Sequence, residues 1–234
     1  MKEISVAVIG SGSTYTPELI DGFLKRHASL KLKKISFMDI DERKRTIVGG
    51  LCVRMLQKAG ADCKVVMTDD LDEALQGADF VVSQIRVGKL PARYLDETIP
   101  IKYHLIGQET TGIGGFFKAL RTIPVMEHIV ERMMAICPNA WLINFTNPSG
   151  ILAEYLQNHT PVKSIGLCNI PINMLEDIRE TEGDDTKITY VGLNHLSWVT
   201  SVVKDGKELL PEMLAKGFTT TVMANIKDDG FSLD

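Results

Sequence analysis

The 234-residue chain is long enough for one large domain or two small ones, and its 44% hydrophobic and 24% charged residues are ordinary for a soluble globular protein. Its net charge of -4 gives no indication of a nucleic-acid partner or an anionic membrane surface, and no apolar run reaches the roughly 18 residues that a membrane span needs. The four cysteines have no close spacing, which argues against a zinc knuckle or a disulfide framework and favours a reducing cytoplasm.

Up to about residue 168 the chain alternates between apolar strand patterns and helix patterns. Six apolar stretches predict strands: 4–10, 33–41, 63–68, 79–85, 140–146 and 162–168. Four stretches predict helices: 17–27, 42–60, 71–78 and about 114–136. This alternation is typical of a parallel sheet with helices on both faces.

The pattern changes after about residue 186. The segment KITYVGLNHLSWVTSVVKDGKELLPEM predicts strands joined by a turn at KDGK, so we expect an antiparallel layer to begin there. We therefore predict a first domain over 1–170 and the beginning of a second domain over 171–234. The last stretch, 219–234, carries no stop signal for a fold, and we expect the chain to be the N-terminal portion of a longer protein.

A glycine-rich turn, GSGSTY at 10–15, follows the first predicted strand and precedes the first helix. In that context Gly10 permits a tight turn, Gly12 lets the backbone approach a pyrophosphate, and the helix N-terminus attracts phosphate. Asp39 ends the second predicted strand, where a carboxylate accepts hydrogen bonds from the adenosine ribose and repels a 2′-phosphate. The order of strand, turn, helix, strand and acid predicts NAD binding over NADP; the alternative is a loop glycine pair beside a solvated aspartate.

Polar residues collect where the later strands end. In an open α/β sheet the ligand crevice lies at the carboxyl ends of the strands, so we expect Arg86, Asn147 and Cys168 to converge there. His195 belongs to a later polar segment, GLNHLSW. A histidine that faces Cys168 across such a crevice is a metal candidate, although single histidines are more often structural and free cysteines are among the most buried residues.

Taken together, GSGSTYTP, QIRVG, GQETTGIGG, NFTNPSG, GLCNIP and GLNHLSW resemble glycoside hydrolase family 4, the NAD- and divalent-metal-dependent glycosidases. The resemblance covers nearly the whole chain and implies an α/β fold, a Rossmann-like doubly wound parallel sheet, followed by the start of an α+β substrate and metal domain. It implies that Cys168 and His195 hold Mn²⁺, although thiolate and imidazole alone favour zinc or iron. The cofactor-binding residues expected from the motifs and the resemblance are Gly10, Gly12, Ser13, Thr14, Asp39, Arg86 and Asn144.

The CNIP form of the cysteine motif resembles the 6-phospho-β-glucosidases of the family, which implies a phosphorylated disaccharide or an aryl 6-phospho-β-glucoside as substrate. The resemblance assigns Arg93 and Asn147 to the substrate, and a guanidinium suits the sugar phosphate. It assigns Asn169 to a sugar hydroxyl and implies that Glu109 raises the basicity of the catalytic base. The alternatives are a surface arginine for Arg93 and a carboxylate at a helix N-terminus for Glu109.

The implied reaction runs through hydride transfer from sugar C3 to NAD⁺, removal of the C2 proton, elimination of the aglycone, addition of water and return of the hydride. The family's base is a tyrosine beyond GLNHLSW, and no tyrosine follows Tyr190 here, so we expect cofactor binding with little turnover. We also expect a cytoplasmic homo-oligomer. Two alternatives stay open: a 2-hydroxy-acid dehydrogenase of the lactate/malate type, and a non-catalytic NAD-binding module.

Overall fold

The computed structural model describes residues 2–218, so the predicted end at 219–234 lies outside the described residues. The chain divides into two compact units between Leu167 and Cys168. Within the described range no helix is long and apolar enough to cross a bilayer. All four cysteines are free thiols.

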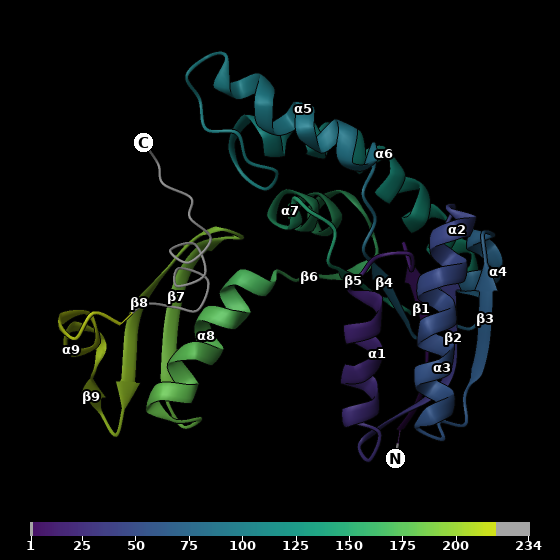
Figure 1. Ribbon diagram of the computed structural model, residues 1–234, viewed down its shortest axis with the longest axis horizontal. Helices are drawn as coiled ribbons and strands as arrows, with labels where there is room; N and C mark the ends of the chain where they lie inside the picture. The colour runs from purple at the N-terminus through teal and green to yellow at the C-terminus, as the bar shows by residue number, and fades with distance from the viewer. Residues whose placement is uncertain (1, 219–234) are drawn as a thin grey trace. The chain divides into compact units, whose positions relative to one another are not determined.

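The first unit is built on a six-stranded parallel sheet (Figure 1). Each strand overlaps a predicted apolar stretch, but the second strand covers Leu30–Met38 and not 33–41, so Asp39 follows this strand and does not end it. In spatial order the strands are β3 (Lys64–Thr68), β2 (Leu30–Met38), β1 (Lys2–Ile9), β4 (Phe80–Ser83), β5 (Trp141–Asn144) and β6 (Lys163–Gly166). The chain runs outward from β1 to β3 and then returns to β4 on the other side of β1. This order is that of a doubly wound sheet, in which the ligand crevice lies at the carboxyl ends of β1 and β4. The Rossmann-like prediction is confirmed.

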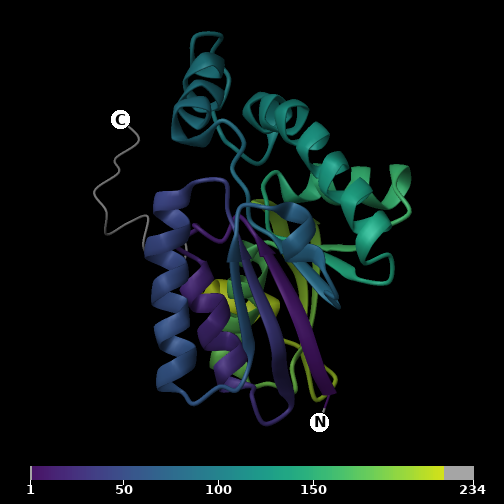
Figure 2. The same cartoon turned by 90° about the vertical axis from the view of Figure 1, so that its right-hand side faces the viewer.

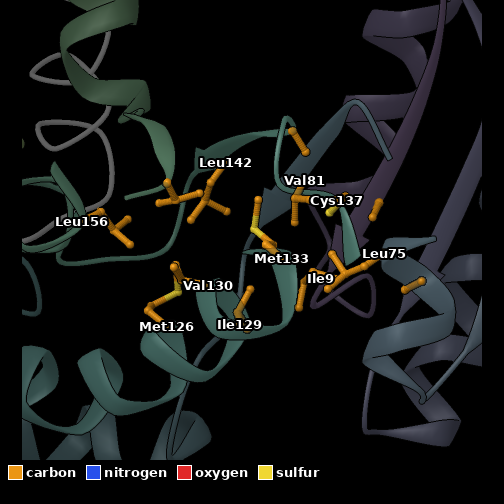
Figure 3. Close-up of a cluster of buried hydrophobic side chains, with 14 of the residues drawn as sticks. Ile9, Leu75, Val81, Met126, Ile129, Val130, Met133, Cys137, Leu142 and Leu156 are labelled. Atoms are coloured by element: carbon orange, nitrogen blue, oxygen red, sulfur yellow. The ribbon is translucent and has the colours of Figure 1, made fainter. Parts of the chain in front are cut away.

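Alternate strand residues belong to two separate hydrophobic cores, one on each face of the sheet. The flanking helices are α1 (Thr16–Lys25), α3 (Gly50–Lys58), α4 (Leu71–Leu75), α6 (Gly112–Ile136) and α7 (Ser149–His159). Ile4, Val6 and Val8 of β1 share a core with α1 and α3, which lie side by side (Figure 2). Ala7 and Ile9 share the other core with α4, α6 and α7 (Figure 3). Helices therefore cover both faces, which leaves the carboxyl ends of the strands as the open edge of the sheet.

The helix predicted over 42–60 is interrupted in the structure. It consists of α2 (Glu42–Lys44), the wider helical turn η1 (Arg45–Gly49) and α3. Gly49 is buried, and a Cβ there would lie 2.8 Å from Cε of Met67 on β3, so the helix approaches the sheet closely at this glycine. A helical apolar pattern carries no signal for such local widening, which is why the sequence predicted one continuous helix.

Helix α5 (Lys89–Ile101) was not predicted, because Pro91 and Pro100 interrupt its helical pattern. Its position depends on a tertiary contact instead. Asp96 of α5 is 2% exposed, and its Oδ2 lies 2.5 Å from Nη2 of Arg121 on α6. Helix α7 was also missed. Tertiary contacts of this kind override a weak local preference.

The second unit combines a helix pair with an antiparallel sheet. Its elements are α8 (Asn169–Glu182), β7 (Lys187–Leu193), β8 (Leu196–Lys204), β9 (Lys207–Glu208) and α9 (Leu210–Ala215). Ile178, Val202 and Met213 form its buried core. Asp205 and Gly206, with φ of 50° and 78°, form the turn between β8 and β9. The predicted antiparallel layer with its KDGK turn is confirmed.

We predict that Leu142→Ala lowers the free energy of unfolding by about 2–5 kcal/mol, because Leu142 on β5 is fully buried and its removal leaves a cavity. Leu120→Ala is the matched control, since Leu120 on α6 is 58% exposed and should change stability by less than about 0.5 kcal/mol. Urea unfolding followed by circular dichroism measures both. Equal losses in the two variants would contradict the assignment of this core.

Candidate active site

The turn after β1 has no room for side chains at its two glycines. Gly10 has a φ of 86°, and a Cβ there would lie 2.8 Å from the carbonyl oxygen of Gln84. A Cβ on Gly12 would lie 2.5 Å from Cβ of Lys44 and 2.7 Å from Oδ2 of Asp39. At these two positions the turn therefore presents only backbone, as the close approach of a pyrophosphate requires.

Helix α1 begins directly after this turn, and no side chain caps its N-terminus. The N–H of Thr16 donates to the carbonyl oxygen of Ser13 at 3.1 Å and Pro17 has no N–H, so this helix end offers an anion chiefly the positive end of its dipole. Ser13 is half-buried and Thr14 is exposed at this helix end. The Ser13 hydroxyl accepts a hydrogen bond from the N–H of Tyr15 at 3.3 Å. Both residues lie at the entrance to α1, where an anion would bind.

Asp39 follows β2 directly and lies against the glycine turn. Its Oδ2 accepts a hydrogen bond from the N–H of Gly12 at 2.7 Å, and its Oδ1 accepts one from the N–H of Asp41 at 2.8 Å. Each carboxylate oxygen has acceptor capacity for a further donor. The carboxylate is thus fixed beside the turn, and its contact with ribose hydroxyls stays a prediction.

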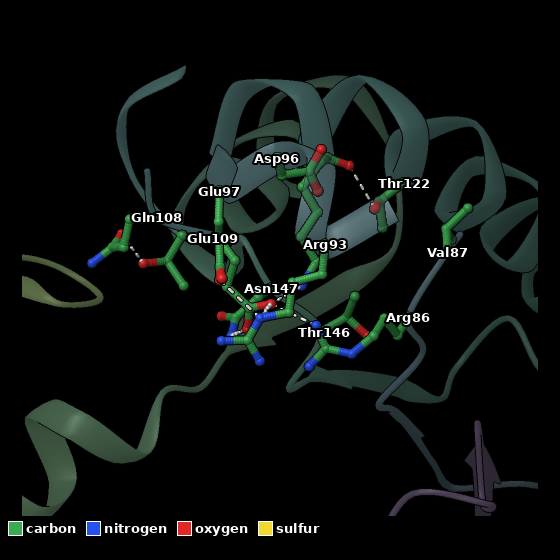
Figure 4. Close-up of polar contacts among 12 residues, drawn as sticks. Arg86, Val87, Arg93, Asp96, Glu97, Gln108, Glu109, Thr122, Thr146 and Asn147 are labelled. Atoms are coloured by element: carbon green, nitrogen blue, oxygen red, sulfur yellow. Dashed lines mark hydrogen bonds and ion pairs between the residues drawn. The ribbon is translucent and has the colours of Figure 1, made fainter. Parts of the chain in front are cut away.

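The buried carboxylate of Glu109 joins four segments of the first unit (Figure 4). Its Oε2 lies 2.5 Å from Nη1 of Arg86, 3.0 Å from Nζ of Lys118 and 3.4 Å from Nε of Arg93. Its Oε1 accepts a hydrogen bond from Nδ2 of Asn147 at 3.3 Å. Arg86 follows β4, Arg93 lies on α5, Lys118 lies on α6 and Asn147 follows β5. We call these five residues the Glu109 cluster.

The charges of the Glu109 cluster decide which form the carboxyl takes. Burial raises the pKa of Glu109, but the hydrogen bond from Arg86 and the charge of Lys118 outweigh burial and lower this pKa to about 2. Burial also lowers the pKa of Lys118, while Glu109 opposes that shift. Arg93 also pairs with Glu97, a residue outside the cluster, at 2.8 Å. With Glu97 included, the three cations of the cluster face two carboxylates. The cluster carries excess positive charge and suits an anionic ligand.

A second ion pair fixes the helix that carries Arg93. Arg121 of α6 donates from Nη2 and Nη1 to the two carboxylate oxygens of Asp96, at 2.5 and 3.1 Å. The same guanidinium donates from Nε to the carbonyl oxygen of Val87, at 3.2 Å. Asp96 lies one helical turn after Arg93. The bidentate pair therefore sets the position of α5 and, through it, of the Arg93 side chain.

Asn144 is fully buried at the end of β5, and its side-chain amide forms hydrogen bonds with neighbouring residues. Its Oδ1 accepts a hydrogen bond from the Ser83 hydroxyl at 2.6 Å, and its Nδ2 donates to the carbonyl oxygen of Thr146 at 3.0 Å. The Thr146 hydroxyl in turn accepts from the N–H of Ile85 at 2.9 Å. These contacts fix the loops after β4 and β5; a direct contact between Asn144 and a cofactor stays a prediction.

The remaining site candidates belong to the second unit. Cys168 is a half-buried free thiol that precedes α8, and Asn169 is the first residue of that helix. His195 lies in the turn between β7 and β8, next to Asn194, which has a φ of 50°. Over residues 2–218 no group of three or more His, Cys, Asp or Glu side chains is arranged to hold a metal ion. The chain's own donor set therefore fits a metal only if other ligands complete it.

Lys118 is the member of the Glu109 cluster that the sequence prediction missed. It occupies the inward face of α6 together with Gly114, Gly115, Ala119 and Thr122, all of them buried. A lysine at a core position of a helix requires a carboxylate partner, because an unpaired buried ammonium is costly. The position of Lys118 among the apolar and small residues of the helix pattern was therefore a usable signal. It predicts a carboxylate partner but does not identify it.

Comparison with known proteins agrees with this geometry. A family model described as family 4 glycosyl hydrolase matches residues 5–184. The 6-phospho-beta-glucosidase of Escherichia coli is 46% identical over 220 residues, which cover 91% of this chain and 49% of that protein. The chain spans about half the length of the curated relatives it matches.

Solved structures of such enzymes superpose on the chain. The 6-phospho-beta glucosidase of Thermotoga maritima with manganese, NAD+ and glucose-6-phosphate has a TM-score of 0.84 at 40% identity and covers 91% of this chain and 52% of its own. A 6-phospho-alpha-glucosidase from gut microorganisms with NAD and Mn2+ has a TM-score of 0.85 at 32% identity, covering 94% and 52%. The match of the family model over most of the described residues shows that this chain belongs to family 4 of the glycosyl hydrolases.

Proposed function

We propose that this chain forms the cofactor- and metal-binding part of a 6-phospho-β-glucosidase that works with NAD⁺ and Mn²⁺. The observation that carries the proposal is the combination, at the carboxyl edge of one sheet, of a glycine turn with no room for a Cβ at Gly10 or Gly12, beside Asp39, and a cationic cluster around Glu109. The β rather than the α substrate class is supported by the higher identity to 6-phospho-β-glucosidases.

NAD⁺ would occupy the glycine turn, with its pyrophosphate at the N-terminus of α1 and its adenosine ribose at Asp39. The divalent metal would be held by Cys168 and His195, with substrate and water oxygens as further ligands. When bound, NAD⁺ supplies a hydride acceptor and the metal supplies a Lewis acid. The residues of this chain bind and orient these groups.

The Glu109 cluster would receive the phosphorylated sugar. Arg93 makes both of its ion pairs through Nε, and its guanidinium has further N–H donors for phosphate oxygens. Asn147 would hold a sugar hydroxyl through its amide, and Asn169 would hold another. Glu109 is ionised, and its Oε1, which accepts a hydrogen bond from Asn147 at 3.3 Å, has acceptor capacity for a further donor such as a tyrosine hydroxyl.

The two alternative functions have less support. Family membership disfavours a 2-hydroxy-acid dehydrogenase, and a non-catalytic NAD-binding module would have no use for the net-positive Glu109 cluster. Four free thiols suit the reducing cytoplasm that we propose as the compartment. Leu90, Tyr94 and Leu95 are exposed on α5, which supports the proposed homo-oligomer.

Calorimetric titration of the purified chain tests the proposal. NAD⁺ should bind, and glucose 6-phosphate should bind with an affinity that Mn²⁺ increases. Absence of any NAD⁺ binding would contradict the proposal for the first unit. Binding of NAD⁺ with no response to the sugar phosphate, with or without Mn²⁺, would contradict it for the Glu109 cluster and the metal ligands.

For the glycine turn we predict that Gly12→Ala weakens NAD⁺ binding by about tenfold or more, because its methyl group would clash with Lys44 and Asp39. Gly22→Ala is the matched control: a Cβ at Gly22 on α1 meets nothing within 4 Å, so NAD⁺ affinity should stay unchanged. Calorimetry gives the affinities and thermal unfolding shows whether each variant is folded. Equal affinities in the two folded variants would place the dinucleotide elsewhere.

For the metal site we predict that Cys168→Ser abolishes Mn²⁺ binding while NAD⁺ binding persists, because a serine hydroxyl is a far weaker ligand than a thiolate. Cys63→Ser is the control, since Cys63 is a half-buried free thiol of the first unit. Free Mn²⁺ measured by electron paramagnetic resonance in the presence of NAD⁺ reports the binding. Unchanged Mn²⁺ affinity in Cys168→Ser would rule out this ligand.

For Glu109 we predict a stability difference that depends on pH. The folded-state pKa of about 2 lies below the ordinary value of 4.5, so the carboxylate stabilises the fold fully above about pH 4.5 and loses this effect as the pH falls toward 2. Glu109→Gln should therefore cost about 3 kcal/mol at pH 7 and much less at pH 3.

Urea unfolding at pH 7, 4 and 3 measures this difference. Glu154→Gln on the exposed face of α7 is the control and should stay within about 0.5 kcal/mol of the parent chain at each pH. A cost of Glu109→Gln that is the same at all three pH values would show that the carboxylate charge is not responsible.

A further inference from the structure

An ion pair between Lys89 and Asp41 joins two segments that leave the sheet on opposite sides of β1. Nζ of Lys89 lies 3.1 Å from Oδ2 of Asp41. Asp41 follows β2 and caps α2, and Lys89 follows β4 and is the first residue of α5. Because β2 and β4 are the two neighbours of β1, this pair spans the carboxyl end of β1.

The glycine turn lies between the same two segments. The position of a Cβ on Gly10 is 2.8 Å from the backbone of Gln84, which follows β4. The position of a Cβ on Gly12 is 2.5 Å from Cβ of Lys44, which follows β2. The ion pair therefore links the segments after β2 and β4, which border the turn on the edge of the sheet where a dinucleotide would bind.

The pair itself does little to stabilise the fold. The Lys89 side chain is 64% exposed and that of Asp41 is 25% exposed, and exposed ion pairs of this kind contribute little because solvent screens them. The backbone at Lys89 is nevertheless fixed: Gly88 and Lys89 have φ of 81° and 54°, and the N–H of Lys89 donates to the carbonyl oxygen of Arg86 at 3.2 Å. A fixed backbone with an exposed ammonium suits a side chain that changes partners.

We propose that Lys89 is a phosphate-binding residue that leaves Asp41 and pairs with the pyrophosphate when a dinucleotide enters the glycine turn. This inference rests on the proposed function, since it needs a dinucleotide in that turn. Asp39 and Asp41 both present carboxylates at this edge, and Arg45 is committed to the carbonyl oxygen of Asp39 and to Asp69. Lys89, from the segment after β4, supplies a cation at this edge, and Asp41 competes with the pyrophosphate for that cation.

The test uses Lys89→Gln and Asp41→Asn in the whole chain. Lys89→Gln should weaken NAD⁺ and ADP-ribose about threefold to tenfold, while adenosine, which lacks a pyrophosphate, should bind as before. Asp41→Asn should tighten NAD⁺ and ADP-ribose about twofold or more, because it frees Lys89, and asparagine caps α2 as well as aspartate does. Lys58→Gln at the end of α3 is the control for net charge.

Calorimetry gives all the affinities. The proposed change of partner by Lys89 would be overturned by unchanged or weaker ADP-ribose binding in Asp41→Asn. Equal ADP-ribose affinities in Lys89→Gln and Lys58→Gln would also overturn it, and either result would leave the proposed function intact. An equal loss for adenosine and ADP-ribose in Lys89→Gln would also overturn the change of partner, since the effect would not involve the pyrophosphate. A parent chain that binds no dinucleotide at all would overturn both the change of partner and the proposed function.

Discussion

The candidate site of the first unit depends on one buried carboxylate, that of Glu109. A carboxylate at this depth is unfavourable on its own, because burial removes the water that would solvate its charge. Its ionised form persists because Arg86, Lys118 and Arg93 lie within 3.4 Å of one of its oxygens. Each of these cations comes from a different segment, so the requirement to pair Glu109 also fixes how those segments meet.

The same arrangement explains why the cluster suits a ligand and not only the fold. Lys118 is 3% exposed and its ammonium pairs with Glu109 inside the protein, whereas the Arg86 and Arg93 side chains are 36% and 41% exposed. Lys118 therefore offsets the charge of Glu109 from inside, and the two arginines keep donors on the accessible side. The bidentate pair of Arg121 with Asp96 then holds α5 against α6, so that Arg93 keeps its position without a ligand.

The sequence predicts the sheet well because its strands read as apolar runs, of which the central β1 is buried on both faces. The glycine turn and Asp39 are also predictable, since strand, turn, helix and acid are local signals in a fixed order. Helix α5 is not predictable in this way, because its two prolines weaken the pattern and its position comes from Arg121 on another helix. Lys118 carries a signal in its spacing, but its partner Glu109 is known only from the folded chain.

The two ends of the proposed site handle anions by different means, and this difference follows from their local structure. At the glycine turn a Cβ added to Gly10 or Gly12 would collide with its neighbours, and the positive end of the α1 dipole is what would attract an anion. At the Glu109 cluster the binding surface is side chains whose charges are set by their neighbours, so substitutions there change protonation and position. Lys89 combines features of both sites. Its backbone is fixed, as in the glycine turn, and its ammonium is exposed, as the Arg86 and Arg93 side chains partly are. The edge of the sheet that carries the turn and the cluster thus also carries a cation whose present partner, Asp41, holds it only weakly.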